Sequence, residues 1–294
     1  MVKQTFLSQV ENKEVLVADG ATGTNLIARG LPGGLTAESW VVNQPESIIQ
    51  LHKDFIDAGA NIILTSTFSA SSIRLKGSML EGKADYINRK AVELAKIAIG
   101  EAFVYIAGSL GPVGQLLKPY GPLDIDNVMN AYAEQARSLS EAGADLLVVE
   151  TQFDLGEINA AIQGVRSISE LPLVVSLSYD RGQRTMMGIS PTQAGRELEE
   201  LPVDIIGINC GRSLDENLLN LASLRQITTK PIWFKPNAGL PHLDPQGKTF
   251  YYVTPQMMGS LVPSWLTTGA QIIGGCCGTS PEHLAEISKH VKIH

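Results

Sequence analysis

The chain has 294 residues, of which 44% are hydrophobic, and it carries a formal net charge of −7 with an isoelectric point near 5.3. This composition is sufficient for a large core, and we expect a single domain spanning residues 1–294. The 23 lysines and arginines are scattered, which argues against a nucleic-acid partner. No segment has the apolar length of a signal peptide or a membrane span, so we expect a cytoplasmic protein without a membrane partner.

Short apolar runs rich in β-branched residues recur along the chain and predict eight strands that are buried on both faces. In chain order these runs are 15–19, 61–67, 104–109, 145–150, 173–178, 204–209, 231–236 and 271–276. Segments with helical periodicity lie between them at 46–58, 84–99, 126–142, 155–167 and 281–291. The alternation predicts an α/β protein with a (β/α)8 TIM barrel, and a doubly wound open sheet is the alternative.

The three cysteines of the chain, Cys210, Cys276 and Cys277, all lie at predicted strand ends. In a barrel of this type the carboxyl ends of the strands form the face that carries the reactive groups, so all three should meet there. Three thiolates suit Zn²⁺, and the lack of a fourth cysteine predicts an open, catalytic coordination position. Inert buried thiols are the alternative, but they do not explain the three glycines around the adjacent pair.

His242 is the only histidine near this predicted face, in the loop after the seventh strand. It could be a fourth metal ligand, but a solvated loop histidine is the reading we favour. Asp19 and Glu150 are acidic residues at strand ends, and they could serve as a general acid and base or hold a substrate ammonium group. Zinc with three thiolate ligands is poorly suited to activating water but well suited to activating a thiol. The residues therefore predict a small thiol substrate with an ammonium group, whose sulfur attacks an electrophile.

Three motifs carry a resemblance to a known family: DGATGT at 19–24, GINC at 207–210 and GGCCGT at 274–279. They resemble the homocysteine S-methyltransferase family, and the likeness runs over essentially the whole chain. Within the family, four further segments look most like the homocysteine-binding module of cobalamin-dependent methionine synthase, namely LTSTF at 64–68, GSLGP at 108–112, KPNAG at 235–239 and GTSPEHL at 278–284.

The resemblance implies a zinc-dependent methyltransferase on a (β/α)8 barrel that converts homocysteine to methionine. Matching positions make Cys210, Cys276 and Cys277 the zinc ligands and leave the fourth position to the homocysteine sulfur. Asp19 and Glu150 correspond to carboxylates that bind the homocysteine amino group.

Other positions are implied to act at the same site. Groups near Gly20, Ala21, Thr65 and Thr67 would hold the carboxylate end of homocysteine. Asn237 matches an asparagine that can occupy the open zinc position when substrate is absent.

The methyl donor is less well indicated than the acceptor. The resemblance implies methylcobalamin carried by another domain or protein, because the chain contains no cobalamin-binding Asp-x-His-x-x-Gly segment. An S-methylmethionine or related sulfonium donor is the alternative, and it is favoured by the length of the chain. Betaine is disfavoured because few aromatic residues lie at strand ends to cage a quaternary ammonium. A zinc- or thiol-binding sensor without turnover is the non-enzymatic alternative, but it would not require Asp19 and Glu150.

Overall fold

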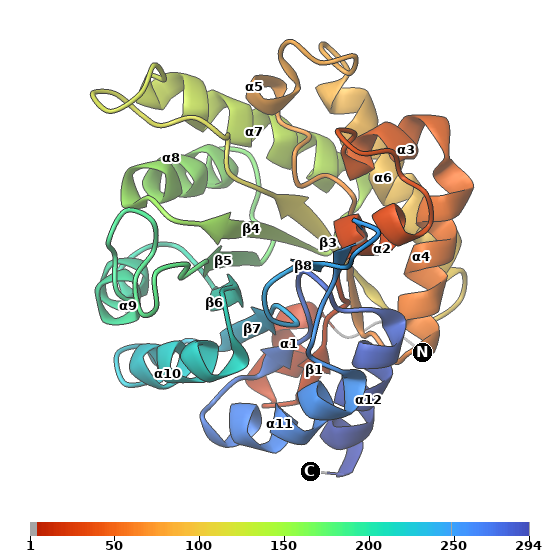
Figure 1. The fold of residues 1–294 in the computed structure, drawn as a ribbon. Helices are drawn as coiled ribbons and strands as arrows, with labels where there is room; N and C mark the ends of the chain where they lie inside the picture. The colour runs from red at the N-terminus through yellow and green to blue at the C-terminus, as the bar shows by residue number, and fades with distance from the viewer. Residues whose placement is uncertain (1–4, 248, 294) are drawn as a thin grey trace.

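The computed structural model describes residues 5–247 and 249–293 and contains a barrel of eight parallel strands surrounded by helices (Figure 1). Neighbouring strands follow the order β1-β10-β7-β6-β5-β4-β3-β2. A parallel bridge between Ala18 and Ile62 joins the two outer strands, and the Asp19 N–H donates to the Ile62 carbonyl at 2.9 Å. The predicted (β/α)8 barrel is confirmed, and the open-sheet alternative is wrong.

Each predicted apolar run overlaps one barrel strand. The strands are β1 (Leu16–Val17), β2 (Ile62–Leu64), β3 (Tyr105–Leu110), β4 (Leu146–Gln152), β5 (Leu173–Leu177), β6 (Ile205–Cys210), β7 (Ile232–Pro236) and β10 (Ile272–Ile273). Strands β3, β4 and β6 extend one or two residues beyond their runs. Strands β1, β2 and β10 are shorter than their runs, although residues that follow them still bond to neighbouring strands, as the Gly274 N–H does to the Phe234 carbonyl at 3.1 Å. A separate antiparallel hairpin comprises β8 (His242–Leu243) and β9 (Thr249–Phe250).

The five predicted helices are confirmed to within two residues at each end. They are α4 (Pro45–Asp57), α6 (Ala84–Ile99), α7 (Ile125–Ala142), α8 (Leu155–Arg166) and α12 (Pro281–Ile293). The structure adds α1 (Phe6–Glu11), α2 (Thr22–Ala28), α3 (Ala37–Asn43), α5 (Ser72–Leu75), α9 (Pro191–Glu199), α10 (Leu214–Arg225) and α11 (Pro255–Thr267). Within the described ranges, none of these helices combines the length and the apolarity needed to cross a membrane.

Three of the helix-to-strand turns share a glycine in the left-handed backbone region. The values of φ are +104° at Gly59, +97° at Gly143 and +105° at Gly269. These residues follow α4, α7 and α11 and reverse the chain into the next strand. An L side chain is strained in this conformation, so glycine makes these short connections possible.

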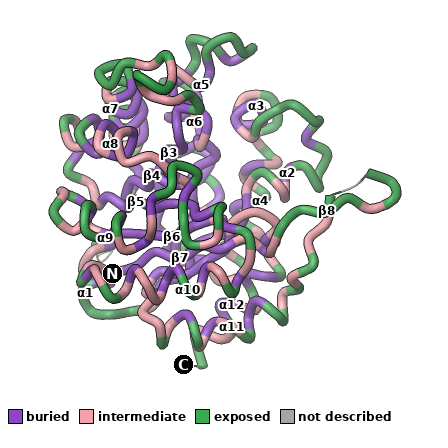
Figure 2. Tube along the Cα trace, turned by 60° about the vertical axis from the view of Figure 1, so that its left-hand side comes forward, coloured by how far each residue is buried: buried purple, intermediate pink, exposed green. Residues whose placement is uncertain are grey.

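The alternation of side chains along the strands builds two apolar layers. One set points into the barrel, where Leu16, Ile62, Leu146 and Trp233 form a cluster with the buried face of α1. The other set packs against the surrounding helices and forms the larger cluster. In Figure 2 the strands are a buried centre within a partly exposed helical layer, and the β8 hairpin projects from it. The barrel is therefore filled by apolar side chains below its carboxyl end.

His52 is an unusual polar residue within the outer apolar layer. It lies on α4 with 2% of its surface exposed, and its Nε2 has no hydrogen-bond partner among the described residues. Burial lowers the pKa of His52 from 6.5 to about 4, and the charge of Asp19 opposes this shift only in part. The side chain is therefore neutral in the folded protein at neutral pH.

His52 should make the fold less stable in acid. The unfolded chain binds a proton below pH 6.5 while the folded chain resists it until about pH 4, so stability falls as the pH falls through this window. Between pH 6.5 and about pH 4.5 the loss attributable to His52 should be about 2 kcal/mol. Urea unfolding of the wild type and of His52→Gln at both pH values measures this difference. An equal loss in both proteins would contradict it.

Candidate functional site

A cavity of about 430 Å³ opens at the carboxyl end of the barrel. Its wall includes all three cysteines together with Glu150 and Lys235. These side chains come from β4, β6 and β7 and from the turn after β10. The cavity lies where active sites of (β/α)8 barrels are found.

The three cysteines converge on one point of this cavity. Their sulfur atoms all lie within 4.8 Å of one another, and they are the one His/Cys/Asp/Glu group in the described ranges that could hold a metal ion. The Cys210 and Cys276 Sγ atoms are 3.1 Å apart. The hydrogen bond with Cys276, the hydrogen bond with Cys277 and burial raise the pKa of Cys210 well above its usual value. Hydrogen bonds from Cys210 and Cys276 lower the pKa of Cys277 to about 3. Three soft donors with an open side fit a tetrahedral Zn²⁺ ion that keeps one position free.

Glycines bring the adjacent pair together, as the sequence predicts. The strand ladder of β10 ends at Ile273, and Cys277 and Gly278 form a turn. Gly278 has φ = +81°, and a Cβ at this residue would lie 2.4 Å from the ring of Tyr251. A Cβ at Gly274 would lie 2.5 Å from the Ala18 carbonyl oxygen. Larger residues would therefore displace the turn that presents both sulfurs.

Asn209 supports the cysteine cluster from below and was not among the predicted site residues. Its Oδ1 accepts hydrogen bonds from the Thr151 N–H at 2.9 Å and the Ser176 hydroxyl at 2.7 Å. Its Nδ2 donates to Thr151 Oγ1 at 2.7 Å and lies 3.3 Å from Cys210 Sγ. Both Thr151 and Cys210 have left-handed backbones, with φ values of 60° and 59°. Strain of this kind costs on the order of 1–3 kcal/mol per residue and requires surrounding contacts to hold it.

Asp19 forms a buried ion pair with Lys235. Lys235 Nζ lies 2.6 Å from Asp19 Oδ1, and the two side chains are 3% and 1% exposed. Asp19 Oδ2 accepts the Leu64 N–H at 2.8 Å. Lys235 borders the cavity, whereas Asp19 lies behind it. The signal for Lys235 in the sequence was a single lysine within the otherwise apolar strand PIWFKP.

Two carboxylates border the cavity, Glu38, whose Oε1 already accepts the Ser69 N–H at 2.6 Å, and Glu150. Glu150 is the one that shares the wall with the cysteines and Lys235 at the strand ends. It is 8% exposed, and its Oε1 accepts the Ser109 hydroxyl at 2.5 Å. Burial raises the pKa of Glu150 to about 7, and the nearby Lys235 opposes this shift. A cationic group bound in the cavity would stabilise its ionised form.

The hydroxyl groups after β2 divide into bonded and free ones. Thr65 Oγ1 and Thr67 Oγ1 lie 2.7 Å apart, Thr67 donates to the Ser109 carbonyl, and the Ser109 N–H donates to Thr65. Both threonine hydroxyls are thus held within the protein. Between them, Ser66 borders the cavity, and its buried Oγ has no partner among the described residues. Ser66 was missed because the sequence alone does not show which of three adjacent hydroxyls is free.

Gly20 and Ala21 also border the cavity, as expected for residues that follow β1. The Ala21 N–H already donates to Thr279, at 3.2 Å to its carbonyl oxygen and 3.1 Å to its hydroxyl. A Cβ on Gly20 would lie 2.7 Å from the Phe55 ring, so only glycine fits there without displacing that ring. The wall of the cavity at this point is therefore backbone.

Asn237 and His242 both follow β7, but the Asn237 Oδ1 is buried and His242 is exposed. Asn237 donates from Nδ2 to the Gly211 carbonyl at 2.8 Å, while its buried Oδ1 has no partner among the described residues. His242 is exposed in β8, where its ring packs against Phe250 and Tyr252. The favoured reading of His242 as a solvated loop residue agrees with this position.

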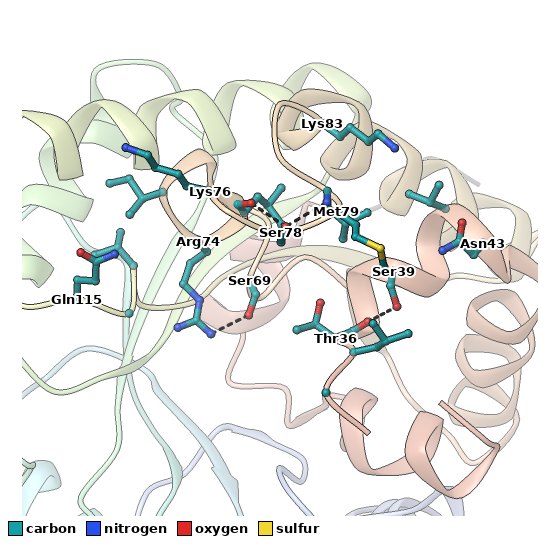
Figure 3. Close-up of a pocket in the computed structure, with 18 residues that line it drawn as sticks. Thr36, Ser39, Asn43, Ser69, Arg74, Lys76, Ser78, Met79, Lys83 and Gln115 are labelled. Atoms are coloured by element: carbon teal, nitrogen blue, oxygen red, sulfur yellow. Dashed lines mark hydrogen bonds between the residues drawn. The ribbon is translucent and has the colours of Figure 1, made fainter. Parts of the chain in front are cut away.

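A second cavity of about 470 Å³ adjoins the first and shares Leu35, Thr36 and Ser69 with it (Figure 3). Its wall contains Arg74, Lys76 and Lys83. Arg74 donates to the Ser69 hydroxyl at 3.2 Å, but Lys76 and Lys83 point in opposite directions at the edge of the cavity. The three cations do not converge on one point, so the cysteine-lined cavity is the better candidate site.

Comparison with known proteins gives relatives over nearly the whole chain. Methionine synthase of Mycobacterium tuberculosis and that of Mycobacterium leprae are each 29% identical over 303 residues, which include 98% of this chain. The chain spans about a quarter of the length of these relatives. The structure of homocysteine methyltransferase MmuM from Escherichia coli, in its metallated form, matches with a TM-score of 0.81 and 26% identity, over 96% of this chain and 98% of that chain.

A family model described as homocysteine S-methyltransferase matches residues 16–291. This range contains every barrel strand and all three cysteines. The chain therefore belongs to the homocysteine S-methyltransferase family.

Proposed function

We propose that this chain is a zinc-dependent homocysteine S-methyltransferase that forms methionine. The observation that carries the proposal is the convergence of three cysteine sulfurs with Glu150 in one cavity at the carboxyl end of the barrel. Family membership supports homocysteine as the methyl acceptor, and the cluster of three cysteines supports zinc as the metal. A sensor without turnover would not require a buried carboxylate beside the sulfurs.

Each group of the cavity has a role in this proposal. Cys210, Cys276 and Cys277 would hold zinc, which when bound lowers the pKa of the substrate thiol and leaves its sulfur nucleophilic. Asn237 does not border the cavity, but its N–H donates to the Cys210 carbonyl at 3.1 Å, and its buried Oδ1, which has no partner among the described residues, would take the open position before substrate binds. Glu150 binds the substrate ammonium group directly, because it borders the cavity.

The other end of the substrate lies against the loops after β1 and β2. The wall formed by Gly20, Ala21 and Thr65 surrounds the carboxylate end, and Thr67, which does not border the cavity, acts with Thr65 by fixing the loop. Asp19 lies behind this wall and contributes through its partners. The substrate sulfur then forms a bond to the methyl carbon as the bond between that carbon and the donor breaks, and most of the rate comes from alignment.

For the donor, we propose methylcobalamin carried by another domain or a separate corrinoid protein. This choice is supported by the similarity to two methionine synthases, in which 98% of this chain matches about one quarter of each relative. A sulfonium donor bound directly in the barrel mouth is the second candidate.

Loss of the cysteines should abolish metal binding. The double variant Cys276→Ser and Cys277→Ser should bind zinc more than about 100-fold more weakly than the wild type, because two of three thiolate ligands are gone. Zinc content after equilibration with buffered zinc measures this, with circular dichroism to verify folding. His242→Ala is the matched control and should retain its zinc, since His242 is exposed outside the cluster. Near-normal zinc in the double variant would refute the metal site.

Glu150→Gln should weaken homocysteine recognition while leaving zinc in place. Losing the charge opposite the ammonium group should lower kcat/KM by about 10- to 100-fold. Glu157→Gln is the control, because Glu157 is also a buried carboxylate but pairs with Tyr132 and Val113 away from the cavity. Steady-state kinetics of both variants measure the effect. Equal losses in the two variants would argue against ammonium binding by Glu150.

The donor can be identified by direct assay. Zinc-loaded protein is given homocysteine with methylcobalamin, S-methylmethionine or betaine, and methionine is measured. We expect methionine with methylcobalamin and none with betaine, because few aromatic residues lie at the strand ends. Methionine from S-methylmethionine alone would replace the first donor with the second candidate.

A further inference from the structure

We infer that Lys235 binds the carboxylate of the amino-acid substrate, so that Lys235 and Glu150 together recognise a zwitterion. The inference rests on the proposed function in that it assumes a thiol-bearing amino acid in the cavity. It assigns a cation to a site for which the sequence suggested only neutral and acidic groups.

The first argument is the unfilled hydrogen-bonding capacity of Lys235. Burial opposes its charge, but Asp19 and Glu150 raise the pKa of Lys235 above its usual value, so the side chain is an ammonium ion. An ammonium group has three donors. Among the described residues its hydrogen-bond acceptor is Asp19 Oδ1, at 2.6 Å. A cation that is 3% exposed is costly to bury unless its remaining donors also find acceptors.

The second argument is the position of the ammonium group. The Trp233 ring, one inward position earlier on β7, lies 5.7 Å from Nζ. Asp19 is itself fixed, because its second oxygen accepts the Leu64 N–H. The ring and Asp19 hold Lys235 in place, and Lys235 also borders the cavity. Asp19 therefore acts as a positioning residue for Lys235.

The third argument is a neutral donor on the same cavity wall. Ser66 borders the cavity, and its Oγ is buried and has no partner among the described residues. It lies two residues after Leu64, whose N–H holds Asp19. A buried hydroxyl without a partner is costly, and an acceptor on the ligand would satisfy it. A carboxylate has enough lone pairs to accept from both Lys235 and Ser66.

The charges of the cavity agree with this assignment. Lys235 uses one of its three donors for Asp19 and keeps the others for the substrate carboxylate, while Glu150 remains for the substrate ammonium group. A substrate carboxylate shared between Lys235 and Ser66 would then have a cation opposite it. A thiol that lacks either charged group would leave a buried charge or hydroxyl without its partner, so the site should reject it.

The test compares homocysteine with 3-aminopropane-1-thiol, which lacks the carboxylate, by calorimetric binding to zinc-loaded protein. Wild type should prefer homocysteine by at least about 100-fold, as expected for a buried charge pair. Lys235→Met should lose about 100-fold in homocysteine affinity and change little toward the analogue. Ser66→Ala should show a smaller loss with the same selectivity, and Lys235→Arg should restore part of the preference. Zinc content of each variant verifies that the cluster is intact.

Each outcome is decisive. If Lys235 has only a structural role, Lys235→Met will weaken both ligands equally, and the inference fails. Should this variant not fold, equal affinity of the wild type for the two ligands would overturn the inference by itself. Wild-type protein that binds neither thiol would instead refute the proposed function, because these binding measurements require no methyl donor.

Discussion

Alternate side chains of every barrel strand point toward the barrel axis. The site depends on the last inward-pointing residue of each strand, because that residue lies at the carboxyl end of the barrel. In β4 the inward positions are Leu146 and Val148, followed by Glu150, and in β7 Trp233 is followed by Lys235. The lower positions pack into an apolar cluster that excludes water. Polar groups above this cluster therefore lie in a medium of low dielectric constant, where charges interact strongly and unpaired groups are costly.

The cysteine cluster shows how the barrel maintains an unfavourable local arrangement. Three sulfurs within 4.8 Å repel one another when they are ionised, and Cys210 presents its sulfur from a left-handed backbone. Asn209, buried in the preceding inward position of β6, bonds both to this sulfur and to the similarly strained Thr151 on β4. One side chain thus links the strained ends of two strands that are not adjacent in the barrel order. Such rigidity favours alignment of a metal-bound sulfur with an incoming methyl group.

The charges of the cavity suit the chemistry proposed for it. Glu150 offers a negative charge, Lys235 a positive one, and the cysteine cluster a place for a divalent cation. A substrate with an ammonium group, a carboxylate and a thiol has one group suited to each of these, in the order Glu150, Lys235 and a metal ion at the cysteine cluster. A metal ion held by the cysteines would then be left for the sulfur, since the other two polar groups of the proposed substrate would have partners of their own. Binding and activation are separated within one cavity in this way.

The sequence by itself determined the barrel and the meeting of its cysteines. Apolar runs and helical periodicity are local patterns that can be read from the sequence. Because the carboxyl ends of all barrel strands lie on one face, residues at the ends of different strands are predicted to lie close together. Tertiary structure alone decided which polar groups are free to act. Asp19 is held by Lys235, 216 residues away, and the Ser66 hydroxyl has no partner in the described part of the chain, while Thr65 and Thr67 bond to each other. The direction of a side chain in a turn depends on contacts between segments remote in sequence, and no local pattern encodes those contacts.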